Sequence, residues 1–314
     1  HFAIPAYHEF GESGSLPVKE IASGGFSLSS VETLWIPNSI EIIGNDAFRQ
    51  NEKLRSIEIE VGSTLRTIKT DAFRDSALLA SVRIPASVET FGNCVFEKCY
   101  SLESVEFEYG SALRTLPTYT FRDCTSLREV RLPESLPVID YGAFLECTGL
   151  KSIDLSGVES LAYKAFCGSG LVSVVIPASV TTLEANVFEN CKSLVDAVID
   201  ARLDAIPSAT FRLCTALSSV SLPSSVKSFG VSVFHSCPLK TISADGSMRD
   251  AGISGVFSAQ VKASAVVVLP STSSDGSETY ATMRDAWKSY GFANIAPAHG
   301  SLPTADGTED GRWE

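Results

Sequence analysis

The sequence predicts an α/β repeat protein, in which about ten coils of 22–25 residues form a right-handed solenoid with a parallel sheet on its concave face. Two regularities support this prediction. Phenylalanines recur every 22–25 residues, and a short phrase of the form LxxVxL recurs in step with them. The anchor phenylalanines are Phe48, Phe73, Phe96, Phe121, Phe144, Phe166, Phe188, Phe211 and Phe234. Because one coil has too small an apolar face to form a core alone, neighbouring coils must stack.

Each LxxVxL phrase is expected to form a short strand. The end of the phrase alternates apolar and polar residues, which is typical of a strand with one buried face. Proline often follows, as at Pro133, and marks the strand's end because it cannot donate to a ladder. A second apolar pair and a short turn of helical character then lead to the phenylalanine. Phe144 should therefore be fully buried, with Phe121 and Phe166 one coil away on each side.

Most of the eight cysteines occupy a single position of the repeat, three residues after the phenylalanine. They are Cys99, Cys124, Cys147, Cys191, Cys214 and Cys237. Other coils place Asn51, Ser76 and Ser169 there. These residue types share small size and hydrogen-bonding ability, so we expect free, inward-facing side chains that bond to backbone groups of their own or the next coil.

Two alternatives for the cysteines stay open at this point. A metal site would require clustered pairs with histidines, and Cys94 and Cys99 form the only close pair. Disulfides between coils would also be within reach, since stacked coils should lie about 4.8 Å apart. Side chains in register on parallel coils point alongside one another, however, which favours free thiols.

The repeat unit resembles that of the BspA-like leucine-rich repeat family, which the phrase "SIEIIGNDAFRQN" at 39–51 follows closely. The phrase "VVVLPSTSSDGSETYATMRDAWKSYGFANI" is similar to the segment that closes the array in many Bacteroidetes surface proteins of this type. The resemblance implies a leucine-rich repeat solenoid over residues 31–257. It also implies a C-terminal cap at 258–298, with an N-terminal lead at 1–30. The acidic residues 299–314 are expected to form a flexible tail.

The composition narrows the class of partner. A net charge of −12 argues against nucleic acids and anionic membranes, because both require a basic surface. No apolar run reaches the roughly 18–20 residues of a membrane span, so no transmembrane segment is expected.

The sequence shows no motif of a nucleophilic, phosphate-binding or zinc-dependent enzyme. We therefore expect no catalytic residues, no metal and no cofactor. Only His235 lies within the repeats, and it should occupy an exposed edge. A Ser–His–Asp site assembles in space and leaves no local motif, so a hydrolase stays as a third alternative.

The polar positions of the strands give the candidate binding residues. The position before the last apolar residue of each phrase begins with Trp35. It then alternates in sign through Glu58, Arg83, Glu106, Arg131 and Asp154. Because opposite charges on neighbouring strands attract, we interpret this run as a self-satisfied ladder rather than a ligand site.

The pattern then becomes apolar, with Val172, Val175, Val195 and Val198 on two adjacent coils. Strand propensity, or cover by another segment such as residues 1–30, would explain these valines structurally. The functional hypothesis is a contact surface that includes these valines and Trp35.

The resemblance implies a non-catalytic secreted or cell-surface module for recognition or adhesion. Its partner would be an extracellular protein or glycan of a host or neighbouring cell. Since the chain begins without Met, we interpret it as a processed or trimmed product, and a lipid anchor on a removed N-terminal segment stays open. The alternative is a glycan-capturing component of a nutrient-uptake system, which would favour Trp35, Tyr100, Tyr109 and Tyr119 clustered on one face.

Overall fold

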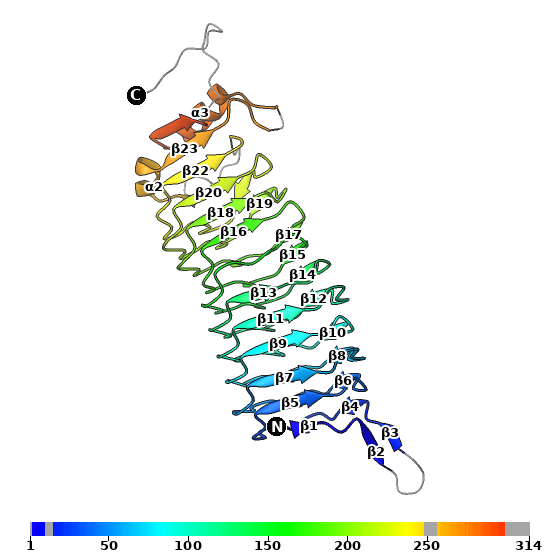
Figure 1. The fold of residues 1–314 in the computed structure, drawn as a ribbon. Helices are drawn as coiled ribbons and strands as arrows, with labels where there is room; N and C mark the ends of the chain where they lie inside the picture. Colours follow the sequence, from blue (N-terminus) through cyan, green and yellow to red (C-terminus); the bar gives the residue numbers. More distant parts are fainter. Residues whose placement is uncertain (1, 10–14, 248–255, 275, 299–314) are drawn as a thin grey trace.

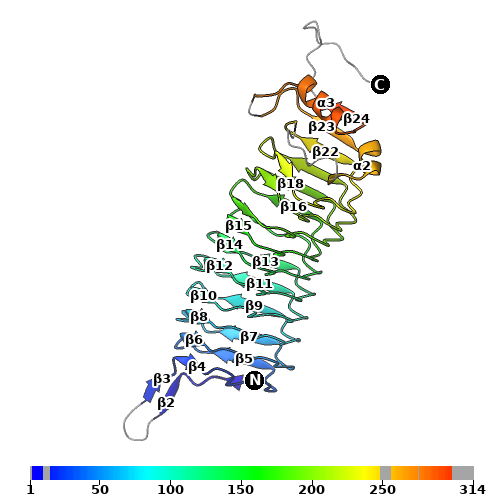
Figure 2. The ribbon, with the colours of Figure 1, turned by 180° about the vertical axis from the view of Figure 1, so that it is seen from behind.

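The computed structural model describes residues 2–9, 15–247, 256–274 and 276–298. The predicted flexible tail, residues 299–314, lies outside the described residues. The described chain is a long stack of coils, with the N-terminal strands at one end and two helices at the other (Figure 1). The view from behind shows that the strands of each coil run in two rows along the whole stack (Figure 2).

The LxxVxL phrases form the first row of strands, and all strand pairs in this row are parallel. Two six-stranded sheets result, in the orders β1-β5-β7-β9-β11-β13 and β16-β18-β20-β22-β23-β24. Residues 151–155 form no strand and separate the two sheets. The repeat strands are β5 Thr33–Ile36, β7 Ser56–Ile59, β9 Ser81–Ile84, β11 Ser104–Phe107, β13 Glu129–Arg131, β16 Ser173–Ile176, β18 Asp196–Ile199, β20 Ser219–Leu222 and β22 Thr241–Ala244.

The second apolar pair of each coil forms a two-residue strand in the second row, whose strands also pair in parallel. Their orders are β10-β8-β6-β4, β12-β14-β15-β17 and β19-β21. The strands are β4 Glu20–Ile21, β6 Ile42–Ile43, β8 Thr67–Ile68, β10 Thr90–Phe91, β12 Thr115–Leu116, β14 Val138–Ile139, β15 Ser160–Leu161, β17 Thr182–Leu183, β19 Ala205–Ile206 and β21 Ser228–Phe229. Along most of the stack, the core therefore lies between two short parallel ladders.

The sequence predicted a turn of helical character around each anchor phenylalanine. This prediction was wrong, because the segment is a run of non-helical turns. From the coil of Phe48 to that of Phe234, the residues two before and two after the phenylalanine have φ between 53° and 70°. At the central coil, the amides of Gly142, Phe144 and Glu146 donate to carbonyls of the next coil at 2.8–3.1 Å. Alternating backbone direction thus lets every second amide bond to the neighbouring coil, which a helical turn would not allow.

The anchor phenylalanines form a continuous stack through the core, from Phe26 to Phe257. Neighbouring ring centroids are 5.0–5.7 Å apart along this stack. Phe144 is 0% exposed and stacks on Phe121 and Phe166 at 5.4 and 5.0 Å. The predicted register of the repeat is therefore confirmed.

The N-terminal residues add strands to both rows. Strand β1 (Phe2–Ala3) pairs with β5, and β4 pairs with β6. Between them, β2 (Tyr7–Glu9) and β3 (Ser15–Pro17) form an antiparallel hairpin.

The C-terminal segment extends the first row and closes the core. It comprises α2 (Ala259–Ser264), β23 (Val266–Leu269), α3 (Tyr280–Ser289) and β24 (Asn294–Pro297). Trp287 is fully buried, donates its indole N–H to the Gly246 carbonyl at 3.0 Å, and lies 6.4 Å from the Phe257 ring. Phe257, the last ring of the stack, is thereby shielded from water.

Candidate binding surface

The cysteines of the repeat position form a ladder of hydrogen bonds between coils. Each thiol donates to the carbonyl of the anchor phenylalanine in the preceding coil at 3.0–3.3 Å. Ser76 makes the same bond to Phe48, and Asn51 to Phe26. Ser169 instead bonds to the Cys191 thiol at 3.3 Å. All eight cysteines are free, which confirms the predicted ladder and removes the disulfide alternative.

One cysteine outside this ladder lies in a small cluster of potential metal ligands. The ligand atoms of Asp71, Cys94 and Glu97 lie within 4.8 Å of one another. The guanidinium of Arg74 is 3.3 Å from Asp71 and 3.4 Å from Glu97, and Arg122 is also 3.4 Å from Glu97. Burial raises the pKa of the Cys94 thiol to about 12, so the thiol is protonated at neutral pH. The two arginines account for both carboxylates, and the cluster is an ion-pair network.

His235 is exposed, as the sequence predicted. Its Nδ1 lies 3.1 Å from the hydroxyl of the neighbouring Ser236. Within the described residues, no carboxylate forms an ion pair or a hydrogen bond with its ring. The described part of the chain thus does not assemble a Ser–His–Asp site around this histidine.

The four candidate valines lie on the solvent side of the first row of strands. Val172, Val175 and Val195 are 43%, 51% and 42% exposed, and Val198 is half-buried. Val175 and Val198 are direct partners across β16 and β18. The described part of the N-terminal lead lies at the far end of the stack and does not cover them (Figure 1). The valines therefore form one exposed apolar surface, named here the valine patch.

The alternating charged row is only partly self-satisfied. Arg83 lies 4.0 Å from Glu106 on the next strand and 3.3 Å from Glu108. In the described part of the chain, Glu58 and Arg131 make no ion pair, although their own row offers opposite charges. The predicted ladder thus exists around Arg83 and fails at both ends of the row. Trp35, at the head of the row, is half-buried and pairs with Glu58 across β5 and β7.

The aromatic residues proposed for glycan capture do not form one cluster. Tyr100 and Tyr109 are 45% and 89% exposed, and no ring contact in the described residues joins either to Tyr119. Tyr119 instead contacts Tyr141 with a centroid distance of 4.8 Å, and Tyr141 contacts Tyr163 at 5.6 Å, so that tilted rings from three coils form a stack. Arg122 and Lys164 lie over the rings of Tyr119 and Tyr163, respectively. Burial raises the pKa of Tyr119 to about 12.

Sequence reasoning missed this stack of tyrosines. Tyr141 and Tyr163 each stand three residues before an anchor phenylalanine, but Tyr119 stands two before. Because Tyr119 occupies a position of the repeat one residue away from that of Tyr141 and Tyr163, the repeat pattern did not indicate that the three rings meet.

Comparison with known proteins identifies the repeat. The pattern described as "BspA type Leucine rich repeat region" matches residues 19–151 and 138–260, in six copies. No curated protein sequence matches the chain. Within the described residues, no helix combines the length and the apolar character needed to cross a membrane.

Two solved structures have the same fold. A leucine-rich repeat protein from Bacteroides ovatus is 22% identical, with a TM-score of 0.54, and the match covers 85% of this chain and 76% of that one. A leucine-rich cell surface protein from Faecalibacterium prausnitzii is 20% identical, with a TM-score of 0.52, covering 99% of this chain and 91% of that one. At these identities the likeness shows the fold alone.

Proposed function

Because this chain belongs to the BspA-type leucine-rich repeat family, we propose that it is a non-catalytic recognition module of the cell surface or extracellular space. Its partner is an extracellular protein that it contacts through the strands of the first row. A stacked solenoid offers a long, rigid surface and places few reactive groups together, which suits recognition better than catalysis. The Faecalibacterium relative is described as a cell surface protein, which supports the location.

The observation that carries this proposal is the valine patch. Strand residues alternate between the core and the solvent face, and the solvent positions are commonly polar, as Glu58, Arg83 and Glu106 are here. Replacing charges by valines on two adjacent strands exposes apolar surface to water without filling the core. Such surfaces mark contact sites for proteins. The β16–β18 ladder has four pairs and the β18–β20 ladder has three, so the backbone under Val175 and Val198 is held in place before binding.

The test is a binding screen of the purified protein against immobilised extracellular-matrix proteins and glycans, followed by variants. For the protein ligand found, Val175→Asp/Val198→Asp should weaken binding by about tenfold or more, because a buried unpaired carboxylate is costly. The matched control is Val231→Asp, at a valine that is 77% exposed outside the first row of strands. Parental affinity in the double variant would move the binding site away from the valine patch.

A second candidate function, glycan capture, is favoured by the stack of Tyr119, Tyr141 and Tyr163. Aromatic rings flanked by cationic groups suit sugars that carry both apolar faces and hydroxyl or acidic groups. If the screen finds only glycans, Tyr163→Ala should abolish their retention. The valine variants should leave it unchanged. If Tyr163→Ala keeps its glycans and the valine variants lose them, the tyrosine stack is not the glycan site.

A further inference from the structure

The first row of strands is interrupted at two places. Strands β7 and β9 share a single pair, Ser56 with Ser81, although both strands are four residues long. Between β13 and β16, residues 151–155 form no strand at all. We name these interruptions the first seam and the second seam. On the far side of each coil the second-row ladder continues across both seams, through β6-β8-β10 and β14-β15-β17.

At each seam, apolar side chains that the repeat directs toward the core are only half-buried. Ile57 and Ile59 on β7 are only half-buried, whereas their counterparts Val82 and Ile84 on β9 are 5% and 0% exposed. At the second seam, Leu132 and Ile153 are likewise half-buried. The repeat places these side chains toward the core, so their exposure reflects the missing contact with the next coil.

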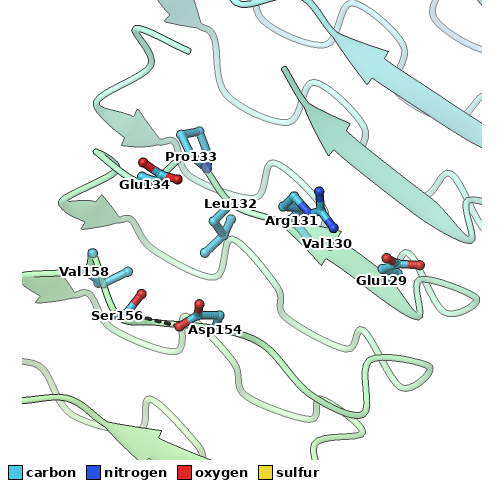
Figure 3. A pocket seen from close by; sticks show the side chains of 10 residues that line it. Glu129, Val130, Arg131, Leu132, Pro133, Glu134, Asp154, Ser156 and Val158 are labelled. Atoms are coloured by element: carbon cyan, nitrogen blue, oxygen red, sulfur yellow. Dashed lines mark hydrogen bonds between the residues drawn. The ribbon is translucent and has the colours of Figure 1, made fainter. Parts of the chain in front are cut away.

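A hollow opens beside each seam. The first has a volume of about 230 Å³ and the second about 260 Å³. Figure 3 shows the second hollow: Leu132 lies between the segment that carries Arg131 and the segment that carries Asp154 and Ser156. Each hollow therefore has an aliphatic floor that continues the core of the solenoid.

The rims of the two hollows carry the same set of charges, three carboxylates and one arginine. The first hollow has Glu58, Glu60, Glu108 and Arg83, and the second has Glu129, Glu134, Asp154 and Arg131. In the first, Arg83 already pairs with Glu108 at 3.3 Å. Within the described residues, the side-chain carboxylates of Glu58 and Glu134 make no hydrogen bond or ion pair. Each hollow thus combines an apolar floor with a surplus of negative charge at its rim.

We propose that the two hollows bind lysine side chains of a basic, extended segment of a partner protein. A lysine matches the chemistry of both parts: its four-carbon stem packs on the aliphatic floor, and its ammonium group reaches the rim carboxylates. A purely aliphatic side chain would leave the carboxylates unused, and an acidic one would be repelled. Carboxylates alone would hold a cation loosely in water, whereas the floor adds apolar contact and fixes the position of the stem.

The spacing of the seams predicts the spacing of the lysines. The first seam follows the coil of β7 and the second follows the coil of β13, so they are three coils apart. At about 4.8 Å per coil this is ~14 Å, which an extended peptide covers in about four residues. Residues four apart in an extended chain also project to the same side. The expected motif is therefore Lys-x-x-x-Lys.

The probe is a short peptide with two lysines four residues apart, separated by threonines and carrying a neutral fluorescent label. Its binding is measured by fluorescence anisotropy. Glu58→Gln/Glu134→Gln, which removes one charge from each rim, should weaken binding by about tenfold. The matched control, Glu52→Gln/Glu159→Gln, removes the same charge at exposed sites outside both hollows and should change affinity by less than about twofold.

Three outcomes would overturn the proposal. Equal weakening in both double variants would mean that the peptide is attracted by the net charge of −12 and not by the two hollows. Equal affinity for a peptide with diaminobutyrate in place of lysine would exclude contact between the stem and the floor. Equal affinity for a peptide with adjacent lysines would exclude simultaneous use of both seams. Val175→Asp/Val198→Asp serves as an independent arm: it should still bind the peptide, whether or not the valine patch is a binding surface.

Discussion

The thiol of Cys124 donates a hydrogen bond of 3.0 Å to the carbonyl of Phe96, the anchor phenylalanine of the preceding coil. Both groups are buried, so no water replaces either partner. Ser76 makes the equivalent bond to Phe48 at 3.1 Å, which shows that a hydroxyl fits the same position. The Phe96 carbonyl also accepts the backbone amide of Cys99 at 3.2 Å, so the thiol adds a second bond, and this second bond joins two coils.

Cys124→Ser should therefore preserve the bond, and Cys124→Ala should lose it. We expect the alanine variant to lower the free energy of unfolding by about 1–2 kcal/mol, because the bond from the thiol is lost and a small cavity forms, while the Phe96 carbonyl still accepts the Cys99 amide at 3.2 Å. The serine variant should lose clearly less. Urea unfolding of both variants measures the difference. Equal losses would show that sulfur packing, and not the hydrogen bond, makes this position important.

The cysteine ladder also predicts how stability depends on pH. Burial raises the pKa of the Cys124 and Cys147 thiols well above the usual value. In the unfolded chain the thiols titrate near their ordinary value of about 8.5. Their contribution to stability is fully present below that pH. It is lost as pH rises further, because the unfolded state gains charge that the folded state resists.

Urea midpoints measured under reducing conditions should accordingly fall between about pH 8.5 and 10. Replacing Cys124 and Cys147 together by serine should make this decline shallower. If the urea midpoint falls as steeply in the double variant as in the parent, titrating groups other than these two thiols cause the fall. In the folded protein, thiol reagents should react slowly at pH 8, and all eight cysteines should become reactive on denaturation.

The sequence predicted the features that repeat and missed those that depend on how closely neighbouring coils approach. The burial of Phe144 and the free thiol of Cys147 follow from period and residue type, and both are confirmed. The half-exposure of Ile57 does not follow, because its alternation is the same as that of buried Val82. Alternation reports which face a residue occupies and does not report whether the next coil closes over it.

Coil length alone would not have revealed the seams. The phrase "EVGST" lengthens the coil that borders the first seam, and "EYGSA" lengthens the coil of β11 in the same way. The β11–β13 ladder that follows is nevertheless complete, since all three residues of β13 are paired. The left-handed positions were missed for a different reason. Asp, Asn and Gly favour them, but Leu213, Tyr119 and Lys164 occupy them as well, which hides the pattern.

Phe144→Ala tests the phenylalanine stack. The ring is fully buried between Phe121 and Phe166, so its removal should lower the free energy of unfolding by about 3–5 kcal/mol through lost burial and a cavity. Phe144→Leu keeps most of the volume and should cost less. Urea unfolding with tryptophan fluorescence gives both values. A loss below about 1 kcal/mol in the alanine variant would contradict the central role of the stack.

Leu213 provides a test of the left-handed positions. Its φ is 62°, its side chain is half-buried, and its amide donates to the His235 carbonyl at 2.8 Å. A side chain with a Cβ is strained there by roughly 1–2 kcal/mol, whereas glycine is not. Leu213→Gly should therefore be more stable to urea than Leu213→Ala, which reverses the usual order of the two residues.

The control is the neighbouring Arg212, whose φ is not positive. Both Arg212→Gly and Arg212→Ala lose the 3.1 Å ion pair to Glu189, so the comparison isolates the backbone. Here alanine should be the more stable of the two, because glycine only adds freedom to the unfolded chain. The same order at both positions would mean that the left-handed conformation at Leu213 stores no measurable strain. The alternating turns would then be an intrinsic preference of the stacked coils. Opposite orders would show that bonds between coils, such as the one from Leu213 to His235, hold the backbone against a local cost.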